Sequence, residues 1–94
     1  MPEANKKYAV TFQTSAFKEY KKLNAVVKKK IDEALDLLSI HPHSDLLQIK
    51  KMRGIEGFYR IRVGEYRIIY TVTRSHLLIT VIRVGHRGDV YRHF

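Results

Sequence analysis

A glycine-containing turn between two alternating segments is the strongest structural signal in this 94-residue chain. Residues 58–63 and 66–72 flank Gly64-Glu65, and a two-residue connection with glycine first is typical of a β-hairpin. This turn places Arg62 directly opposite Arg67. Because side chains alternate across a strand, the hairpin has an apolar face and a basic face. The apolar face carries Tyr59, Ile61, Val63, Tyr66, Ile68, Tyr70 and Val72, and the basic face carries Phe58, Arg60, Arg62, Arg67, Ile69 and Thr71.

The first half of the chain predicts a strand followed by two helices. Residues 8–14 alternate as a strand does, and residues 16–23 form a short helix with Thr14 or Ser15 as its N-cap. Residues 25–39 carry apolar side chains at helical spacing. Asn24 either ends the first helix or caps the second, and His41-Pro42 stops the second because a residue before proline avoids helical backbone.

The second half predicts mainly strands. Residues 43–57 have no clean period and are expected to form a loop with a short strand or turn. Residues 77–84 form a further strand after the hairpin, and the tail at residues 90–94 stays unassigned. We therefore expect one domain over residues 1–94, of the α+β class and in the order β-α-α-β-β-β. Its two N-terminal helices pack on one face of a largely antiparallel sheet.

Composition excludes several classes of function. The chain has no cysteine, which excludes a disulfide scaffold, a thiolate metal site and a cysteine nucleophile. Residues 1–7 have no apolar stretch of the kind a secretory signal needs. Residues 77–82 form the longest apolar run, interrupted by one threonine, and it is too short to span a bilayer. We therefore expect a cytoplasmic protein with no membrane partner.

Positive charge is concentrated in the second half of the chain. The formal net charge is +9, which favours a polyanionic partner. Residues 1–49 carry eight basic and six acidic side chains, and every basic one is lysine. Residues 50–94 carry ten basic and three acidic side chains, and eight of the ten are arginine. Because the planar arginine fork suits phosphate recognition, the second half is expected to hold the functional site.

The paired arginines of the hairpin point to a binding role. Like charges directly opposite each other destabilise a strand pair, so Arg62 facing Arg67, with Arg60 one pleat away, is costly for stability alone. A bound polyanion would offset this cost, and Phe58 adds an aromatic surface beside the charge. Any single exposed arginine is ordinary, and Arg74 and Arg83 are read as such.

Three segments of the second half resemble the RelE toxins of the RelE/ParE superfamily. They are Lys51-Met52-Arg53-Gly54, the hairpin segment from Phe58 to Tyr70, and Arg83-Val84-Gly85-His86-Arg87-Gly88-Asp89-Val90-Tyr91. The resemblance extends from Val10-Thr11-Phe12 to Tyr91 in the same order of elements. It implies a ribosome-dependent, metal-independent endoribonuclease that needs no cofactor and cuts messenger RNA in the A site. It also implies a RelB-type antitoxin that wraps and inactivates the toxin.

The resemblance also implies roles for individual residues. Arg60 and Arg62 stand where the best-studied type has lysines, and Arg67 matches an arginine that contacts phosphate. Arg87 matches the arginine that stabilises the transition state, and Tyr91 matches a tyrosine that stacks on the nucleotide or exchanges protons with it. The basic residues that match contacts to ribosomal or messenger RNA are Lys51 and Arg53. An arginine stays protonated, so Arg60 or Arg62 is a poor general base where a lysine could serve.

The expected chemistry is attack of a ribose 2′-hydroxyl on its own 3′-phosphate, which leaves a 2′,3′-cyclic phosphate and a 5′-hydroxyl end. Arg62, Arg67 and Arg87 are expected to converge on the phosphate and stabilise the charge of the transition state. His86 titrates near neutrality and is a candidate for proton transfer, with Tyr91 as the second. His41 and His43 are a poor metal pair because a proline separates them. Two alternatives stay open: a ParE-like inhibitor of DNA gyrase on the same fold, and a non-catalytic RNA-binding module.

Overall fold

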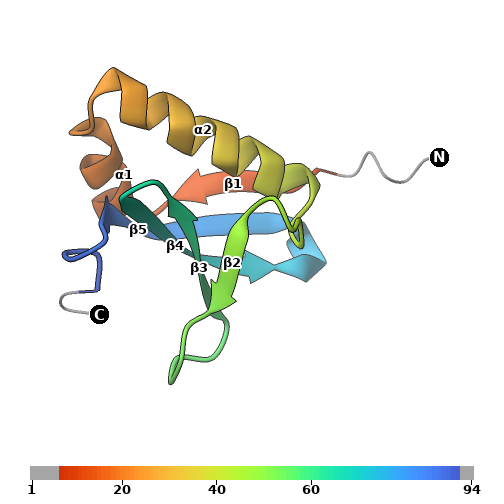
Figure 1. The fold of residues 1–94 in the computed structure, drawn as a ribbon. Coiled ribbons are helices and arrows are strands. Elements are labelled where there is room, and N and C mark those ends of the chain that lie inside the picture. Colours follow the sequence, from red (N-terminus) through yellow and green to blue (C-terminus); the bar gives the residue numbers. More distant parts are fainter. Residues whose placement is uncertain (1–6, 92–94) are drawn as a thin grey trace.

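A computed structural model describes residues 7–91, which form a five-stranded sheet and two α-helices (Figure 1). The elements follow the chain in the order β1 (Ala9–Phe12), α1 (Thr14–Lys21), α2 (Ala25–Ile40), β2 (Gln48–Lys51), β3 (Phe58–Val63), β4 (Tyr66–Thr73) and β5 (Leu78–His86), with a 3-10 turn, η2 (Arg74–His76), before β5. The strand order in the sheet is β1-β5-β4-β3-β2. Only the β1–β5 pair is parallel within the described sheet, so the largely antiparallel α+β fold is confirmed.

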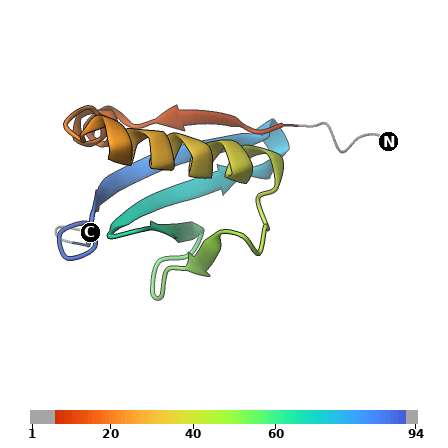
Figure 2. The same ribbon diagram turned by 45° about the horizontal axis from the view of Figure 1, so that its top comes forward.

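Both helices cover the same face of the sheet, as Figure 2 shows most clearly. The core lies between them and that face, and the strand residues that contribute to it come from the apolar side of the hairpin and from β5. Its buried members are Ala16, Ile31, Leu35, Leu38, Ile61, Ile68, Tyr70, Ile79, Val81 and Val84. The opposite face of the sheet is left free of helices and carries the basic residues.

The hairpin register is confirmed residue by residue. Arg62 pairs with Arg67, and Arg60 pairs with Ile69. Gly64 has a φ of 60°, a backbone conformation that glycine adopts at little cost. The two-residue turn therefore fixes which side chains of β3 and β4 face the helices and which face away.

The helix caps differ partly from expectation. Asn24 caps α2, because its side-chain oxygen accepts a hydrogen bond of 2.9 Å from the backbone N–H of Val27. Helix α1 begins at Thr14, and its N-cap is Gln13 without a side-chain hydrogen bond. The expected cap at Thr14 or Ser15 is therefore wrong. Helix α2 ends at Ile40, just before His41-Pro42, as the sequence indicates.

Two strands differ from the expected set. The expected order β-α-α-β-β-β did not count β2, which is the short strand allowed for within residues 43–57 and pairs with β3 at the edge of the sheet. Strand β5 continues two residues past the expected end, to His86. Residues 1–6 and 92–94 lie outside the described residues, and with them most of the N-terminal segment and the last three residues of the unassigned tail. Neither described helix is long and apolar enough to cross a membrane.

Asn24→Ala is expected to lower the free energy of unfolding by about 1 kcal/mol, because an orphaned N–H at the start of α2 loses its acceptor. Urea denaturation followed by circular dichroism measures the change. Asn24→Ser is the matched control, since serine also caps helices and should retain most of the stability. Equal loss in both variants would show that the cap is not the cause.

The buried side chain of Tyr70 is expected to make the free energy of unfolding fall at alkaline pH. Burial of its side chain, which is 1% exposed, raises the pKa of Tyr70, and the nearby Tyr59 adds to the shift. Above about pH 10 the unfolded chain loses this proton while the folded chain keeps it. The stabilisation is thus full below pH 10 and falls by about 1.4 kcal/mol per pH unit above it. Urea midpoints between pH 9 and 12 should fall more steeply in the parent than in Tyr70→Phe, and parallel curves would contradict the assignment.

Candidate nucleic-acid interface and catalytic site

A row of cationic side chains crosses the sheet on the face away from the helices. Lys50 on β2 pairs with Arg60 on β3, and Arg60 pairs with Ile69 on β4. Arg67, also on β4, pairs with Gly85 on β5, and Arg87 follows directly after that strand. Because partners in register share a face, three neighbouring strands and the turn after β5 contribute cationic side chains to one basic surface.

This surface is hollowed into a cavity of about 680 Å³. Its lining residues are Lys50, Lys51, Met52, Arg53, Arg60, Arg67, Arg87, Gly88 and Tyr91. Six of these nine are lysine or arginine, and none is acidic or histidine. Such a lining is chemically suited to an anionic ligand that carries phosphate groups.

Arg67 is the buried member of the row. It is 8% exposed, and its Nη1 donates hydrogen bonds to the carbonyl oxygens of Tyr66 at 3.1 Å and Gly64 at 3.3 Å. A buried charge is costly unless hydrogen bonds satisfy it, and the hairpin turn supplies these acceptors. The side chain is thus held in place before any ligand arrives.

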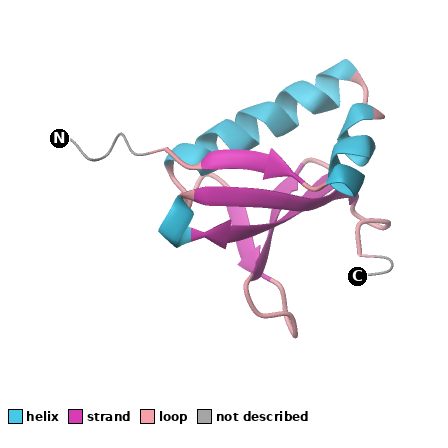
Figure 3. Ribbon diagram, turned by 180° about the vertical axis from the view of Figure 1, so that it is seen from behind, coloured by secondary structure: helices cyan, strands magenta, loops and turns pink. Residues whose placement is uncertain are grey.

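The turn after β5 carries two of the predicted catalytic residues. The carbonyl oxygen of His86 accepts hydrogen bonds from the N–H of Asp89 at 2.8 Å and of Val90 at 3.0 Å. Val90 is fully buried and lies over Gly85, where an added Cβ would stand 3.6 Å from Val90. This packing folds the turn back onto the sheet, at the blue end of the chain in Figure 1 and the loop beyond β5 in Figure 3. Arg87 and Tyr91 thereby reach the cavity.

Arg87 is bound to the hairpin turn twice. Its N–H donates a 2.8 Å hydrogen bond to the carbonyl oxygen of Glu65, and its Nε lies 3.2 Å from the Glu65 carboxylate. Both side chains are about 60% exposed, so the ion pair is worth little in free energy. The guanidinium can exchange this carboxylate for a phosphate at small cost.

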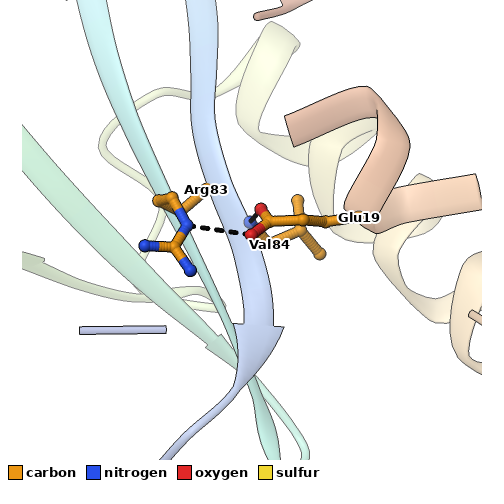
Figure 4. A network of polar contacts seen from close by, with 3 residues as sticks. All are labelled: Glu19, Arg83 and Val84. Atoms are coloured by element: carbon orange, nitrogen blue, oxygen red, sulfur yellow. Dashed lines mark hydrogen bonds and ion pairs between the residues drawn. The ribbon is translucent and has the colours of Figure 1, made fainter. Parts of the chain in front are cut away.

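Helix α1 anchors the end of β5 through one carboxylate (Figure 4). Glu19 Oε2 accepts a 2.9 Å hydrogen bond from Arg83 Nε, and Glu19 Oε1 accepts one of 2.9 Å from the N–H of Val84. Strand β1 pairs with β5 only as far as Val81, so this N–H has no strand partner. The carboxylate satisfies it and fixes the strand from which the Arg87 turn departs.

Three predicted site residues do not line the cavity. Arg62 is exposed opposite Arg67 on the same face but lies outside the lining. His86 pairs with Tyr66, which belongs to the apolar face, and the two rings are 5.7 Å apart. Phe58 lines a smaller neighbouring hollow of about 260 Å³ together with Lys51. The cavity thus unites Lys51, Arg53, Arg60, Arg67, Arg87 and Tyr91.

Sequence reasoning missed Lys50 and Glu19. A signal for Lys50 was present, because Leu47, Gln48, Ile49 and Lys50 alternate apolar and polar over four positions. That pattern predicts a short strand with Lys50 on its polar face. No signal in the sequence connects Glu19 to Val84, since 65 residues separate them.

The same residues limit the chemistry available at the site. Within residues 7–91, no three histidine, aspartate or glutamate side chains come together in a way that could hold a metal ion. The lining offers guanidinium and ammonium groups with one phenol. Such an arrangement can neutralise a phosphodiester and stabilise the extra negative charge of its transition state.

Comparison with known sequences connects this site to a family. Residues 7–91 match the family described as ParE toxin of type II toxin-antitoxin system, parDE. A putative RelE-like toxin protein of Escherichia coli is 34% identical over 89 residues, which cover 90% of each chain. The mRNA interferase toxin RelE of E. coli strain K12 is 33% identical over 92 residues, covering 89% of this chain and 90% of the relative.

Solved structures share the fold. The isolated E. coli RelE toxin superposes with a TM-score of 0.72 at 30% identity, covering 89% of this chain and 90% of that one. The RelE of a RelE–RelB complex from Pyrococcus horikoshii OT3 gives a TM-score of 0.75 at 26% identity, covering 88% and 98%. With a family match over nearly its whole length and relatives above 30% identity, this chain belongs to the RelE/ParE superfamily and is a RelE-like toxin of a type II toxin–antitoxin system.

Proposed function

We propose that this protein is an endoribonuclease that cleaves messenger RNA in the ribosomal A site and so inhibits translation. The observation that carries the proposal is the convergence of Arg60, Arg67, Arg87 and Tyr91 on one cavity from three separate parts of the fold. Relatives of the same length are mRNA interferases by name, which supports assigning the cavity to RNA. Lys51 and Arg53, at its edge, hold messenger or ribosomal RNA.

The reaction is attack of the ribose 2′-oxygen on the adjacent phosphorus. The P–O5′ bond breaks, and the products carry a 2′,3′-cyclic phosphate and a 5′-hydroxyl. Negative charge increases on the non-bridging oxygens in the transition state, and Arg60, Arg67 and Arg87 neutralise it, so no metal ion is required for this role. Tyr91 stacks on the nucleotide or exchanges a proton with it, whereas His86 lies on the other face of the sheet. Arg62 contacts RNA from the rim.

Positioning of the message supports dependence on the ribosome, and the weak, exposed Glu65–Arg87 ion pair adds only a small cost for free RNA. In the free chain the Arg87 guanidinium binds a carboxylate, and an RNA phosphate must displace it. A flexible message alone pays the full entropy of ordering at the site, while the ribosome presents the message already positioned. Cleavage is therefore efficient only on the ribosome. The proposed site of action is accordingly the cytoplasm, where ribosomes translate messages.

The neutralising partner is a RelB-type antitoxin. Structures of relatives include RelE–RelB complexes from Pyrococcus horikoshii, Methanococcus jannaschii and Escherichia coli. The net charge of +9 favours an antitoxin segment with acidic side chains that face the arginines. An amphipathic helix or a strand of such a segment would lie across the basic surface.

Arg87→Ala and Arg67→Ala are expected to lower the rate of A-site cleavage by at least about 10²–10³-fold, because each removes a preorganised cation from the transition state. Primer extension on message in translating ribosomes measures the new 5′ ends. Thermal unfolding of each variant separates lost chemistry from lost structure, which matters most for the buried Arg67.

Arg74→Ala is the matched control, because Arg74 is an exposed arginine outside the cavity whose Nη1 lies 3.3 Å from His43 Nε2. It should cleave at the parent rate. Parent-level cleavage by Arg87→Ala would contradict the assignment. Loss of gyrase supercoiling without new RNA ends would instead support a gyrase inhibitor, and neither effect would support a binding module.

Replacing the 2′-hydroxyl at the cleaved nucleotide with hydrogen is expected to abolish cleavage, because the nucleophile is then absent. Message with a single 2′-deoxy position, placed in the A site, tests this against all-ribose message. Mass spectrometry of the ribose product should detect a 2′,3′-cyclic phosphate. A cleaved deoxy message, or a 5′-phosphate product, would exclude the mechanism.

A further inference from the structure

Most cations of the cavity are arginines, so another group must supply the proton that the leaving 5′-oxygen needs. The departing 5′-oxygen leaves as an unstable alkoxide unless it receives a proton as the P–O5′ bond breaks. Arginine stays protonated in proteins, so Arg60, Arg67 and Arg87 stabilise charge but do not transfer protons. His86 is excluded from the cavity by its place on the apolar face. The remaining lining groups with a transferable proton are Lys50, Lys51 and Tyr91.

The strand register separates the two lysines. Lys50 pairs with Arg60 and therefore shares the face of the arginine row. Lys51 pairs with Tyr59, whose side chain packs against the core on the helix side. Lys51 also lines the neighbouring hollow beside Phe58. Lys50 is thus the lysine whose strand position directs it onto the arginine face of the cavity.

Lys50 and Tyr91 stand at opposite ends of the arginine row. Lys50 lies on the edge strand β2, and Tyr91 follows β5, with β3 and β4 between them. Three strand spacings of about 4.8 Å separate β2 from β5. In a phosphoryl transfer the attacking and leaving oxygens lie in line on opposite sides of phosphorus. Lys50 and Tyr91 therefore flank a phosphate held by the arginines, one on each side.

We propose that Lys50 is a catalytic residue, the general acid that protonates the leaving 5′-oxygen. The inference rests on the proposed ribonuclease function. The bond from O2′ to phosphorus forms as the P–O5′ bond breaks, and the Lys50 ammonium gives one proton to O5′ to make the 5′-hydroxyl. The proton of the 2′-hydroxyl leaves to water at the Tyr91 end, and the neutral Lys50 amine takes a proton back from water. Lys50 thereby supplies the transferable proton that Arg60 and Arg62 cannot provide.

The test compares oxygen with sulfur as the leaving atom. A message with a 5′-bridging sulfur at the cleaved bond releases a thiolate, which needs no proton because a thiol has a pKa of about 8.5. Lys50→Ala should cleave all-oxygen message about 10²–10⁴-fold more slowly than the parent, and sulfur-bridged message within about tenfold of the parent. Single-turnover rates with saturating toxin on preformed ribosome complexes remove any effect on binding.

Three further variants complete the experiment. Lys50→Arg keeps the positive charge without a transferable proton, so it should be slow on oxygen and restored on sulfur. Arg87→Ala should stay slow on both messages, because it stabilises charge on the non-bridging oxygens. Lys30→Ala removes an exposed lysine from helix α2 and should match the parent.

Two results would overturn the role of Lys50. Equal slowing of Lys50→Ala on both messages would show that its charge alone matters, and parent-level cleavage of oxygen message by Lys50→Ala or Lys50→Arg would show that it gives no proton. If the parent itself leaves A-site message intact, the proposed function fails and the inference fails with it.

Discussion

The register of the β3–β4 hairpin is the constraint on which the site depends. Side chains repeat every second residue along a strand, so a slip of one residue would exchange the apolar and basic faces. Gly64, at a φ of 60°, permits the two-residue turn that prevents this slip. The same turn supplies the two carbonyl oxygens that hold the Arg67 guanidinium. One short connection therefore both sorts the faces and stabilises a buried cation.

Clustered positive charge lowers the stability of the sheet and favours the binding of an anion. Arg62 and Arg67 lie directly opposite each other, a like-charge pair that destabilises a sheet. The core on the other face is continuous across β3, β4, β5 and both helices, and it carries the stability of the chain. Because the two faces are separated by the sheet itself, the site can be strongly cationic while the core stays free of charged side chains.

Local patterns predicted the hairpin and the second helix, and offered the Asn24 cap as one of two alternatives, since each depends on residues close in sequence. Strand β2 was expected only as a short strand or turn without assigned bounds in residues 43–57, because it has four residues and lies at the sheet edge, where little burial marks it. His86 adjoins Arg87 in sequence and lies two residues past the expected end of the last strand at residue 84. Strand β5 in fact continues through His86, and the pleat directs it toward Tyr66. The place of Arg87 and Tyr91 in the cavity also depends on the packing of Val90 over Gly85. No alternation pattern in the sequence specifies this contact.

The Glu19 carboxylate lies at the outer edge of the sheet, where a second chain could pair with β5. Strand β1 ends at Phe12, so β5 continues beyond its strand neighbour, and helix α1 packs beside this part of β5. Open strand edges are templates on which a second chain can add by backbone pairing, and proteins block them to avoid aggregation. Glu19 accepts the hydrogen bond of the Val84 N–H on this edge, so this donor is already used. The anchor that steadies the functional end of the sheet thus also acts as a guard against intermolecular strand addition.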